Sequence, residues 1–322
     1  WKLMREGIIV KRSSIVETLG STTVICTDKT GTITENTMHL KHLYDYQSDI
    51  IFGEKDFGDT TLSTLIDYAM WSSEPVPFDP MEKTLHKVYE QTQKNDARKD
   101  YRMFHEYPLD GKPPMMTHLF ENKEKHRIIA AKGAPEAILN VATLSESEKN
   151  KVQELIKSFG QQGFRVLGVA KSNFEGDDFP GKQQQFRFDF LGLVVFYDPP
   201  KKGIQDVFQH IYDAGIKVKV ITGDNTDTTK SIAAQAGIVN TAEAVEGKGI
   251  MEYSEEKLLQ EVEEKVLFTR MFPDAKLAVV NALKKKGEVV AMLGDGVNVS
   301  ILNMSAVFSQ MHGDTISARL LT

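Results

Sequence analysis

The sequence has little cysteine and no hydrophobic run long enough to cross a membrane. Its single cysteine, Cys26, lies inside a short apolar run. A disulfide framework is therefore excluded, and we expect a reducing compartment. The longest apolar stretches, at 191–196 and 289–293, have the length of buried strands, whereas a membrane-spanning helix needs about 20 apolar residues. No signal peptide is visible, and because the sequence starts with Trp1 rather than Met, we expect the chain to be part of a longer protein.

The sequence also lacks the excess of basic residues that marks a nucleic-acid-binding surface. The 39 Lys and Arg residues and 45 Asp and Glu residues give a formal charge of −6, so we expect no nucleic-acid partner. The basic run at 284–286 ends a helical pattern just before Gly287, where the helix dipole favours positive charge. A hydrophobic content of 41% and a charged content of 26% are typical of a soluble globular protein, and 322 residues can hold two domains.

Four apolar segments of strand length end in polar loops. They cover residues 23–27, 191–196, 218–221 and 289–293. Helical patterns at 203–214 and 274–286 lie between the last three, and each is followed by a glycine. The alternation of strands and helices predicts an α/β fold with a doubly wound parallel sheet. Continuous apolar strands fit a sheet that is covered on both faces.

The region from about 37 to 197 has a different character. Polar runs separate its strand-like pieces, and one helix begins at a capping box formed by Ser145 and Glu148. We interpret 37–197 as an inserted α+β domain, which divides the sheet domain in the sequence into residues 1–36 and 198–322.

Asp28 is the candidate nucleophile because it stands directly after the first apolar segment. Residues 28–34 read DKTGTIT, so a glycine and three hydroxyl side chains follow the carboxylate closely. Open α/β sheets bind their ligands at the carboxyl ends of the strands, and aspartate forms an aspartyl-phosphate in phosphoryl transfer. A lone aspartate at a strand end is usually a helix cap or a turn residue. The complete seven-residue string favours phosphoryl transfer.

The loops after other strands supply the remaining parts of a phosphoryl-transfer site. Attack on a phosphoanhydride needs a cation and donors for the phosphate oxygens. Asp295, in GDGVN, is an oxygen donor suited to Mg²⁺. The turn Thr222-Gly223-Asp224 offers a hydroxyl and a backbone N–H, and Lys276 at a helix start can hold the phosphate charge. Each residue type is common in structural roles, but in this order they resemble the haloacid-dehalogenase-like phosphotransfer core.

The residue two positions after Asp28 distinguishes phosphatases from enzymes that keep the phosphate. Phosphatases of that superfamily carry an aspartate there, which serves as general acid and then as base. This chain has Thr30, which takes up no proton near neutral pH. We therefore expect a phosphate on Asp28 to persist. A free-standing soluble phosphatase with a large cap is the least favoured function.

The string at 28–34 is also the signature of P-type ATPases, and five further blocks resemble that family in the family's order. They read VETLG at 16–20, KGAPE at 132–136, DPPK at 198–201, TGDN at 222–225 and GDGVN at 294–298. Within that family, these sequence blocks are most similar to those of the calcium and sodium/potassium pump branches. The resemblance implies the large cytosolic loop of an ATP-driven cation pump, at the cytosolic face of a membrane. Residues 37–197 are then the nucleotide-binding domain, and the remainder is the phosphorylation domain.

The resemblance also implies cofactors and partners. The implied Mg²⁺ ligands are Asp28, Asp295 and the carbonyl of Thr30. The implied ATP-site residues are Lys132, Gly133, Arg165, Leu109 and Glu106, the last facing the adenine. The transported cation, the membrane helices and the actuator domain of the same full-length chain are further implied partners, so this chain alone is not competent for transport.

Two departures from the family pattern bear on activity. Leu109 lies in a segment where the family has a phenylalanine that stacks on adenine, so we expect an ATP dissociation constant of about millimolar or weaker. Val299 stands where the family has a second aspartate after GDGVN, and its loss is expected to weaken Mg²⁺ binding. The alternative to an active pump is therefore a degenerate, catalytically weak homologue with a nucleotide-sensing or regulatory role. The transported ion and the oligomeric state are not encoded in these motifs.

Overall fold

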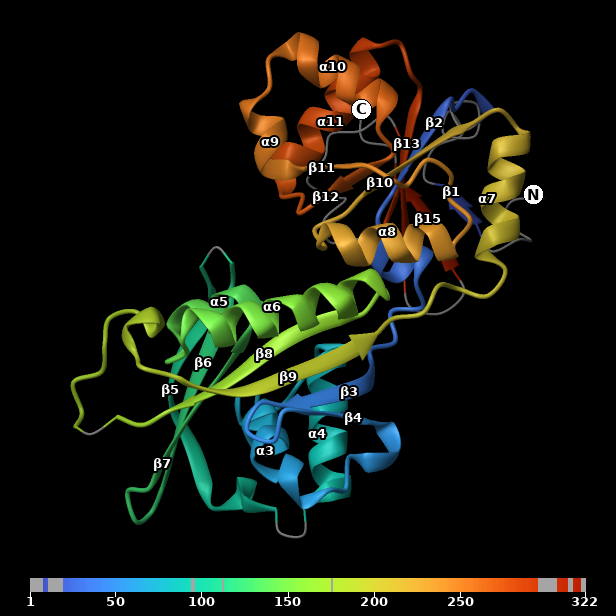
Figure 1. The fold of residues 1–322 in the computed structure, drawn as a ribbon. Helices are drawn as coiled ribbons and strands as arrows, with labels where there is room; N and C mark the ends of the chain where they lie inside the picture. The colour runs from blue at the N-terminus through green and yellow to red at the C-terminus, as the bar shows by residue number, and fades with distance from the viewer. Residues whose placement is uncertain are drawn as a thin grey trace. The chain divides into compact units, whose positions relative to one another are not determined.

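The structure is a computed structural model that describes residues 8–10, 20–93, 96–111, 113–174, 176–294, 306–311 and 315–319. The chain folds into two compact units (Figure 1). Unit 1 comprises residues 1–36, 161–163 and 198–322, and unit 2 comprises residues 37–160 and 164–197. Each unit has its own sheet, and the described residues form one apolar core in unit 1 and two in unit 2.

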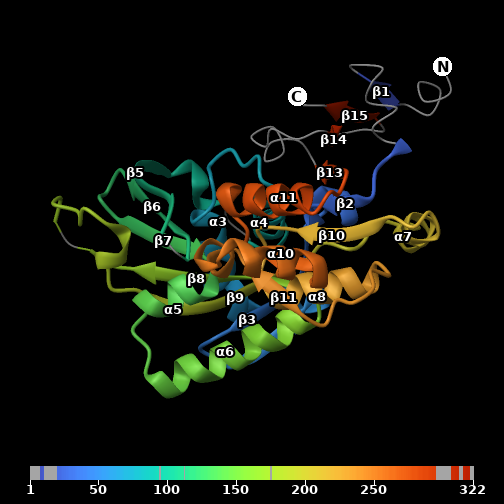
Figure 2. The same cartoon turned by 90° about the horizontal axis from the view of Figure 1, so that it is seen from above.

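The sheet of unit 1 is mainly parallel. Among the described residues it has eight strands in the order β1-β15-β14-β13-β2-β10-β12-β11. Their bounds are β1 Ile8–Val10, β2 Val24–Thr27, β10 Lys217–Ile221, β11 Ala244–Glu246, β12 Leu267–Thr269, β13 Val290–Gly294, β14 Ala306–Met311 and β15 Thr315–Arg319. Every neighbouring pair is parallel except β14 and β15. Strand β2 lies inside the sheet between β13 and β10 (Figure 2).

Helices pack on both faces of this sheet. They are α7 Ile204–Asp213, α8 Thr226–Gln235, α9 Gly247–Glu252, α10 Glu255–Glu264 and α11 Pro273–Lys285. Helices α9, α10 and α11 share an apolar core with Val24 and Cys26 of β2, whereas α7 contacts β10, and α8 contacts β11 and β12. The two groups lie on opposite sides of the strands in Figure 1. The doubly wound α/β fold expected from the sequence is confirmed.

The helix ends of unit 1 follow from local chemistry. The patterns at 203–214 and 274–286 become α7 and α11, and the glycines that follow them, Gly215 and Gly287, have φ of 74° and 83°. This left-handed backbone ends helices and favours glycine. The basic run at the end of α11 is confirmed as a solvated helix terminus, because Lys285 and Lys286 are exposed and the partner of Lys285, Glu255, is exposed as well.

The sheet of unit 2 is antiparallel. Among the described residues it has seven strands in the order β4-β3-β9-β8-β7-β6-β5. Their bounds are β3 His39–Asp45, β4 Ile50–Gly53, β5 Tyr101–Asp110, β6 Met115–Asn122, β7 Arg127–Gly133, β8 Arg165–Ser172 and β9 Asp189–Tyr197. The helices are α3 Ser63–Trp71, α4 Pro80–Thr92, α5 Pro135–Val141 and α6 Glu146–Gln161. Short 3₁₀ turns cover Glu54–Asp56, Thr60–Leu62, Ala97–Lys99 and Gln183–Gln185.

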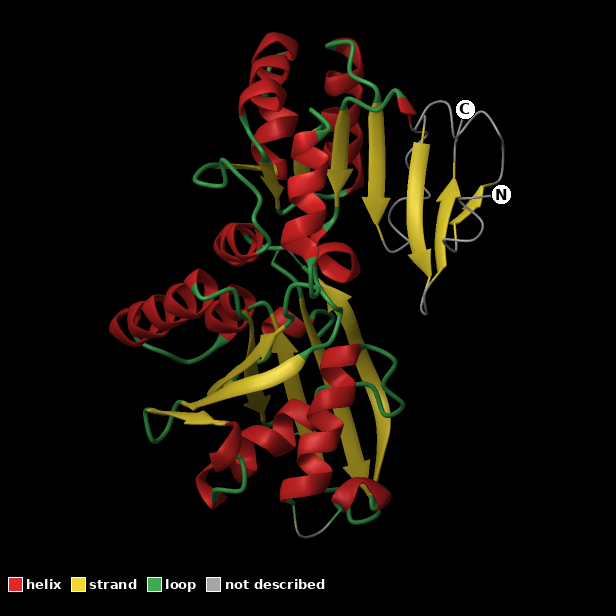
Figure 3. Ribbon diagram, turned by 90° about the vertical axis from the view of Figure 1, so that its right-hand side faces the viewer, coloured by secondary structure: helices red, strands yellow, loops and turns green. Residues whose placement is uncertain are grey.

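Helices also cover both faces of the second sheet (Figure 3). Side chains of α3 and α4 form one core with alternate strand residues, and side chains of α5 and α6 form the other. None of the described helices of either unit combines the length and the apolar composition that a membrane crossing demands.

One strand differs from the sequence prediction. The apolar run at 191–196, interpreted as part of the strand–helix alternation, is β9 and pairs antiparallel with β3 and β8. Val194 and Phe196 face the core beneath α3 and α4, while Leu193 and Val195 face the core beneath α5 and α6. A strand buried on both faces is continuously apolar in either type of sheet, so its composition does not reveal the direction of its neighbours.

Candidate active site

Asp28 follows the interior strand of the parallel sheet. It comes directly after Thr27, the last residue of β2, and its backbone N–H donates to the carbonyl of Leu293 in β13 at 2.9 Å. Because β2 and β10 are parallel neighbours, the loop after β10, which begins at Thr222, starts at the same end of the sheet as Asp28. The sheet therefore holds the carboxylate of Asp28 beside the Thr222-Gly223-Asp224 turn.

Residues 29–33 form a wide turn that fixes the orientation of Asp28. The N–H of Lys29 donates to Asp28 Oδ1 at 2.7 Å, and the N–H of Thr34 closes the turn on the Lys29 carbonyl at 3.1 Å. Thr30 has φ −70° and ψ 129°, and Gly31 has φ 72° and ψ −12°. These are the angles of a type II turn, whose third position requires positive φ. The positive φ of Gly31 thus explains why the motif has a glycine at this position.

The turn is anchored by the second half of the split unit. The hydroxyl of Thr34 donates to Asp198 Oδ2 at 2.5 Å, and the ammonium of Lys201 donates to the Gly31 carbonyl at 2.7 Å. Asp198 is buried, and the N–H of Glu35 donates to the Pro199 carbonyl at 2.9 Å. The DPPK block, which the sequence marks without giving it a role, therefore positions the turn that carries Asp28.

Two lysines pair with the two aspartates of the site. Lys276 Nζ lies 2.7 Å from Asp28 Oδ2, with the Lys276 side chain 6% and the Asp28 side chain 14% exposed. Lys29 Nζ lies 2.6 Å from Asp224 Oδ2, and the Thr30 hydroxyl donates to the same oxygen at 3.3 Å. Pro273 at the first position of α11 places Lys276 in the first turn of that helix. Lys29 was absent from the residues expected in the site.

Thr222 and Gly223 differ in accessibility. Thr222 is buried and fixed on both sides, because its N–H donates to the Phe268 carbonyl and its own carbonyl accepts from Met271, each at 2.9 Å. Its hydroxyl accepts from the N–H of Asp224 at 3.3 Å. Gly223 is exposed. The exposed part of the turn is therefore its backbone at Gly223.

The oxygen donors around Asp28 are chemically suited to a magnesium ion. The Asp28 carboxylate is partly exposed, and the Thr30 carbonyl belongs to the same turn. Carboxylate and carbonyl oxygens are the hard ligands that Mg²⁺ prefers. Asp295 and Val299 lie outside the described residues, so the third expected ligand and the departure beside it stay predictions.

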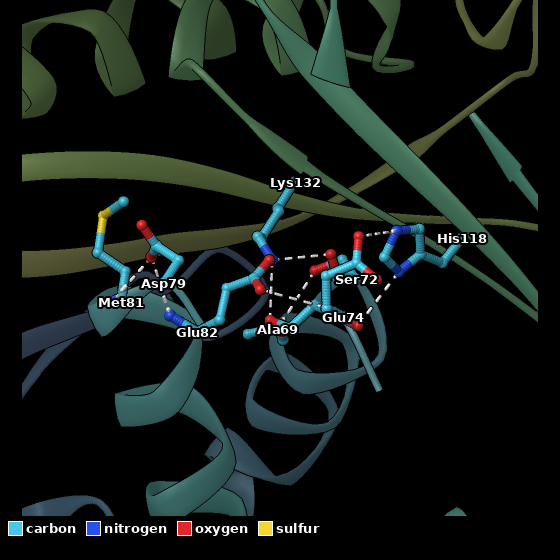
Figure 4. A network of polar contacts seen from close by, with 9 residues as sticks. Ala69, Ser72, Glu74, Asp79, Met81, Glu82, His118 and Lys132 are labelled. Atoms are coloured by element: carbon cyan, nitrogen blue, oxygen red, sulfur yellow. Dashed lines mark hydrogen bonds and ion pairs between the residues drawn. The ribbon is translucent and has the colours of Figure 1, made fainter. Parts of the chain in front are cut away.

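Lys132, expected at the ATP site, lies in a buried ion pair in unit 2 (Figure 4). Its ammonium donates to Glu82 Oε1 at 2.5 Å, and to the Ser72 carbonyl and Ser73 Oγ at 2.8 Å each. These three acceptors use all three of its N–H donors. Burial lowers the pKa of Lys132, and the charge of Glu82 opposes that shift. Glu82 was not foreseen from the sequence.

The position of Glu82 has a partial sequence signal. Asp79 caps α4 by accepting from the N–H groups of Met81 and Glu82 at 2.8 and 3.3 Å, and Pro80 occupies the first position of the helix. An Asp-Pro pair predicts a helix start. The inward direction of Glu82 depends on Lys132, which lies 50 residues further along the chain.

The other residues expected at the ATP site are spread over the second sheet. Glu106 is exposed on β5, opposite His118 of β6, and the Leu109 side chain is 63% exposed. Arg165 begins β8, whereas Lys132 on β7 pairs with Val169. On β8, Arg165 lies four residues before Val169, which is about 13 Å along the strand. The register therefore places Arg165 well away from Lys132.

Gly133 has a packing role in unit 2. A Cβ on Gly133 would lie 2.6 Å from the Pro114 carbonyl oxygen and 2.6 Å from Met115 Cα. The backbones of β6 and β7 approach too closely here for any side chain. The glycine of the KGAPE block is therefore required by the sheet, whatever binds beside it.

Comparison with known proteins identifies related chains. The family model described as haloacid dehalogenase-like hydrolase matches residues 22–302. The chain is 28% identical to the calcium-transporting ATPase of Bacillus subtilis, over 92% of this chain and 38% of the relative. It is 29% identical to calcium-transporting ATPase 1 of Saccharomyces cerevisiae (92% and 36%). It is also 29% identical to the magnesium-transporting ATPase, P-type 1, of Salmonella typhimurium (92% and 33%). The chain thus spans 33–38% of the length of these relatives.

Proposed function

Because the chain belongs to the haloacid dehalogenase-like hydrolases, we propose that it is the cytosolic catalytic part of a P-type cation-transporting ATPase that forms an aspartyl-phosphate on Asp28. The observation that carries the proposal is the Asp28–Lys276 pair of 2.7 Å at the end of β2, with Thr30 two residues later. Relatives named calcium- and magnesium-transporting ATPases support a cation as cargo without choosing the ion. Transport itself needs membrane helices and an actuator domain from the rest of a full-length protein at the cytosolic face of a membrane.

In the proposed reaction an oxygen of the Asp28 carboxylate attacks the γ-phosphorus of ATP. A new O–P bond forms, the bond from that phosphorus to the β–γ bridging oxygen breaks, and its electron pair leaves with ADP. Lys276, already 2.7 Å from Asp28 Oδ2, offsets the negative charge that gathers as phosphate meets carboxylate. The Thr222 hydroxyl and the backbone N–H of Gly223, an exposed residue, are the proposed donors to the equatorial phosphate oxygens. Asp224 holds the two residues that follow the proposed nucleophile, through an ion pair with Lys29 and a hydrogen bond from the Thr30 hydroxyl.

Mg²⁺, when bound, supplies neutralisation of the phosphate charge and alignment of the transferred group. The proposed ligands are the Asp28 carboxylate, the Thr30 carbonyl and Asp295. The hard oxygen donors that the structure describes at Asp28 and Thr30 support this ion.

Persistence of the phosphate is the second part of the proposal. The Thr30 hydroxyl donates to Asp224 Oδ2 at 3.3 Å and does not ionise near neutral pH, so it cannot act as a general base. Hydrolysis of an acyl phosphate needs a base to activate water, and position 30 does not provide one. A lasting phosphoenzyme suits a protein that couples phosphorylation to a conformational change.

For unit 2 we propose nucleotide binding, with Glu106, Leu109, Lys132, Gly133 and Arg165 as the residues implied by the family. The exposed Leu109 offers an apolar surface to a purine but no aromatic ring. The ammonium of Lys132 has three acceptors already, so a nucleotide must compete with Glu82 for it. Both observations support weak ATP binding, with a dissociation constant of about millimolar.

The test is phosphorylation of the full-length protein by γ-labelled ATP. Acid-stable, hydroxylamine-sensitive label is expected in the wild type and its complete loss in Asp28→Asn. Asp274→Asn is the matched control, because Asp274 is an exposed carboxylate at the start of α11, and it should label normally. Label that survives in Asp28→Asn would disprove the assignment of Asp28 as the nucleophile.

The second candidate function is that of a degenerate homologue that senses nucleotide or regulates another protein. The absence of a carboxylate at Val299 favours it. Phosphoenzyme yield would be titrated with Mg²⁺ in the wild type and in Val299→Asp. A large gain in Val299→Asp at low Mg²⁺ supports degeneracy, whereas equal curves with full labelling exclude it.

A further inference from the structure

Three potential metal ligands meet on one face of the second sheet. They are Glu74, which follows α3, Glu106 on β5 and His118 on β6, and one ligand atom from each lies within 4.8 Å of the other two. His118 Nε2 lies 3.9 Å from Glu74 Oε1. Glu106 is directly opposite His118 in the β5–β6 register. The strand pairing and the α3 end therefore bring the three side chains together.

His118 presents a free lone pair toward the two carboxylates. Its side chain is 0% exposed, and its Nδ1 lies 3.1 Å from the Ser73 carbonyl. A carbonyl oxygen only accepts, so Nδ1 carries the proton, and Nε2 of the neutral ring bears the lone pair. Among the described residues Nε2 has no hydrogen-bond partner.

The Nδ1 bond to Ser73 is the arrangement that metal-binding histidines use. In metal sites the ring nitrogen that does not ligate usually donates to a carbonyl or a carboxylate, which fixes the tautomer and the ring orientation. Ser73 itself is held in place, because its Oγ accepts from the ammonium of Lys132 at 2.8 Å. His118 is thus oriented before any ligand arrives.

The local charge is compatible with a cation. The charge of Lys132, the nearest lysine in this network, is matched by Glu82 at 2.5 Å. Glu74 and Glu106 remain as two carboxylates around a neutral imidazole. Glu106 is exposed and the Glu74 side chain is 31% exposed, so an ion can arrive from solvent on the carboxylate side.

We propose that Glu74, Glu106 and His118 form a site for one first-row divalent transition metal ion, with Zn²⁺ and Co²⁺ as representative ions. An imidazole with two carboxylates suits these metals, whereas Mg²⁺ and Ca²⁺ prefer all-oxygen sites. Ligand atoms around a tetrahedral zinc ion lie about 3.3 Å apart, so binding needs a small inward movement of the two flexible glutamates. The proposal concerns unit 2 alone and does not depend on phosphorylation of Asp28, but it assigns Glu106 to the metal as well as to the proposed nucleotide site.

The test is a titration of the full chain with Co²⁺, followed by visible absorption, and with Zn²⁺, followed by calorimetry, in the presence of saturating Mg²⁺. One ion per chain is expected, with Co²⁺ d–d bands that Zn²⁺ removes and that Ca²⁺ leaves unchanged. Affinity should fall at least about tenfold in His118→Gln and in Glu106→Gln. Glu106 is exposed, so its variant should fold normally even if His118→Gln does not.

A surface pair provides the matched control. His126 Nδ1 lies 3.9 Å from Glu124 Oε2, the same separation as in the proposed site, but both side chains are more than 70% exposed. His126→Gln should leave the affinity unchanged. The proposal is overturned if no ion binds, if Glu106→Gln binds like the wild type, or if His126→Gln removes the binding.

Discussion

Single residues show two different uses of a lysine–carboxylate pair in this molecule. The Lys276–Asp28 pair lies at the carboxyl ends of the parallel strands, and part of its carboxylate is exposed. The side chains of Lys132 and Glu82, in contrast, are both more than nine-tenths buried. A partly exposed carboxylate can approach an incoming phosphate. A buried ammonium with three acceptors is held where it is, and each partner becomes costly to remove.

Replacing Glu82 by glutamine should destabilise unit 2 strongly. Glu82→Gln leaves the Lys132 ammonium buried without its counter-charge, which costs about 3 kcal/mol or more of unfolding free energy. Urea unfolding measures the change. Glu255→Gln is the matched control, because it breaks the exposed Lys285–Glu255 pair of 2.8 Å and should cost less than about 1 kcal/mol. Equal losses in the two variants would contradict the buried-pair account.

Replacing Thr30 by aspartate should shorten the life of the phosphoenzyme. Thr30→Asp introduces a carboxylate two residues from Asp28 that can activate water, and we expect decay at least about tenfold faster. A chase with unlabelled ATP after labelling measures the decay. Thr30→Asn has a similar size but no titratable group and should keep the wild-type lifetime. If Thr30→Asp and Thr30→Asn decay at the same rate, the role given to Thr30 is wrong.

The stability of unit 2 should depend on the protonation of Asp67 in α3. Burial raises the pKa of Asp67 to about 6, and its Oδ1 is buried without a hydrogen-bond partner among the described residues. The folded state then holds a proton that the unfolded state releases at lower pH, so this group makes stability fall as pH rises from about 4 to about 6. Asp67→Asn should therefore stabilise the protein by about 1–2 kcal/mol near pH 7.5, after a discount for partial exposure.

The same substitution should have little effect near pH 4, because Asp67 is then protonated in both states. Urea unfolding of the wild type and the variant at the two pH values provides the measurement. A difference in unfolding free energy that stays constant with pH would show that Asp67 is not the responsible group.

At the scale of elements, the close approach of β6 and β7 restricts the KGAPE segment. Gly133→Ala puts a methyl group 2.6 Å from the Pro114 carbonyl oxygen, and we expect a loss of about 2 kcal/mol or more in unfolding free energy. Gly181→Ala is the control, because a Cβ there meets nothing within 4 Å. A Gly133→Ala variant as stable as Gly181→Ala in thermal unfolding would disprove the packing role.

Elements with a local signal could be predicted from the sequence, and those fixed by distant partners could not. The ends of α7 and α11 follow from apolar periodicity and the glycines after them. Asp28 and Lys276 were expected at one edge of the sheet, where the structure places them 2.7 Å apart; their catalytic roles stay predictions. The direction of β9 could not be predicted, because burial on both faces removes the alternation that distinguishes sheet types.

The residues missed in unit 2 depend on contacts between distant segments. Glu82 faces inward because Lys132 meets it, and Glu106 lies opposite His118 because the β5–β6 register shifts once on each side of that pair. Neither fact leaves a pattern in the local sequence. Sequence reasoning therefore selected Lys132 and Glu106 as binding residues without the buried partners that surround them.

At the scale of the whole molecule, the two units are built on sheets of different type. The parallel sheet of unit 1 carries Asp28, the proposed nucleophile, at the carboxyl ends of its strands, where such sheets bind ligands. The antiparallel sheet of unit 2 interrupts unit 1 in the sequence. Contacts such as Thr34–Asp198 join the two sequence halves of unit 1 across 164 residues, so the insertion leaves the Asp28 turn intact.

The most direct test of the central claim is to identify the phosphorylated residue. Full-length protein would be incubated with MgATP, quenched in acid and treated with borohydride, which reduces an aspartyl-phosphate to homoserine. Peptide mass spectrometry should find homoserine at position 28, dependent on ATP and absent in Lys276→Ala. Homoserine at another aspartate, or none at position 28 under conditions where the protein binds and consumes ATP, would contradict the account.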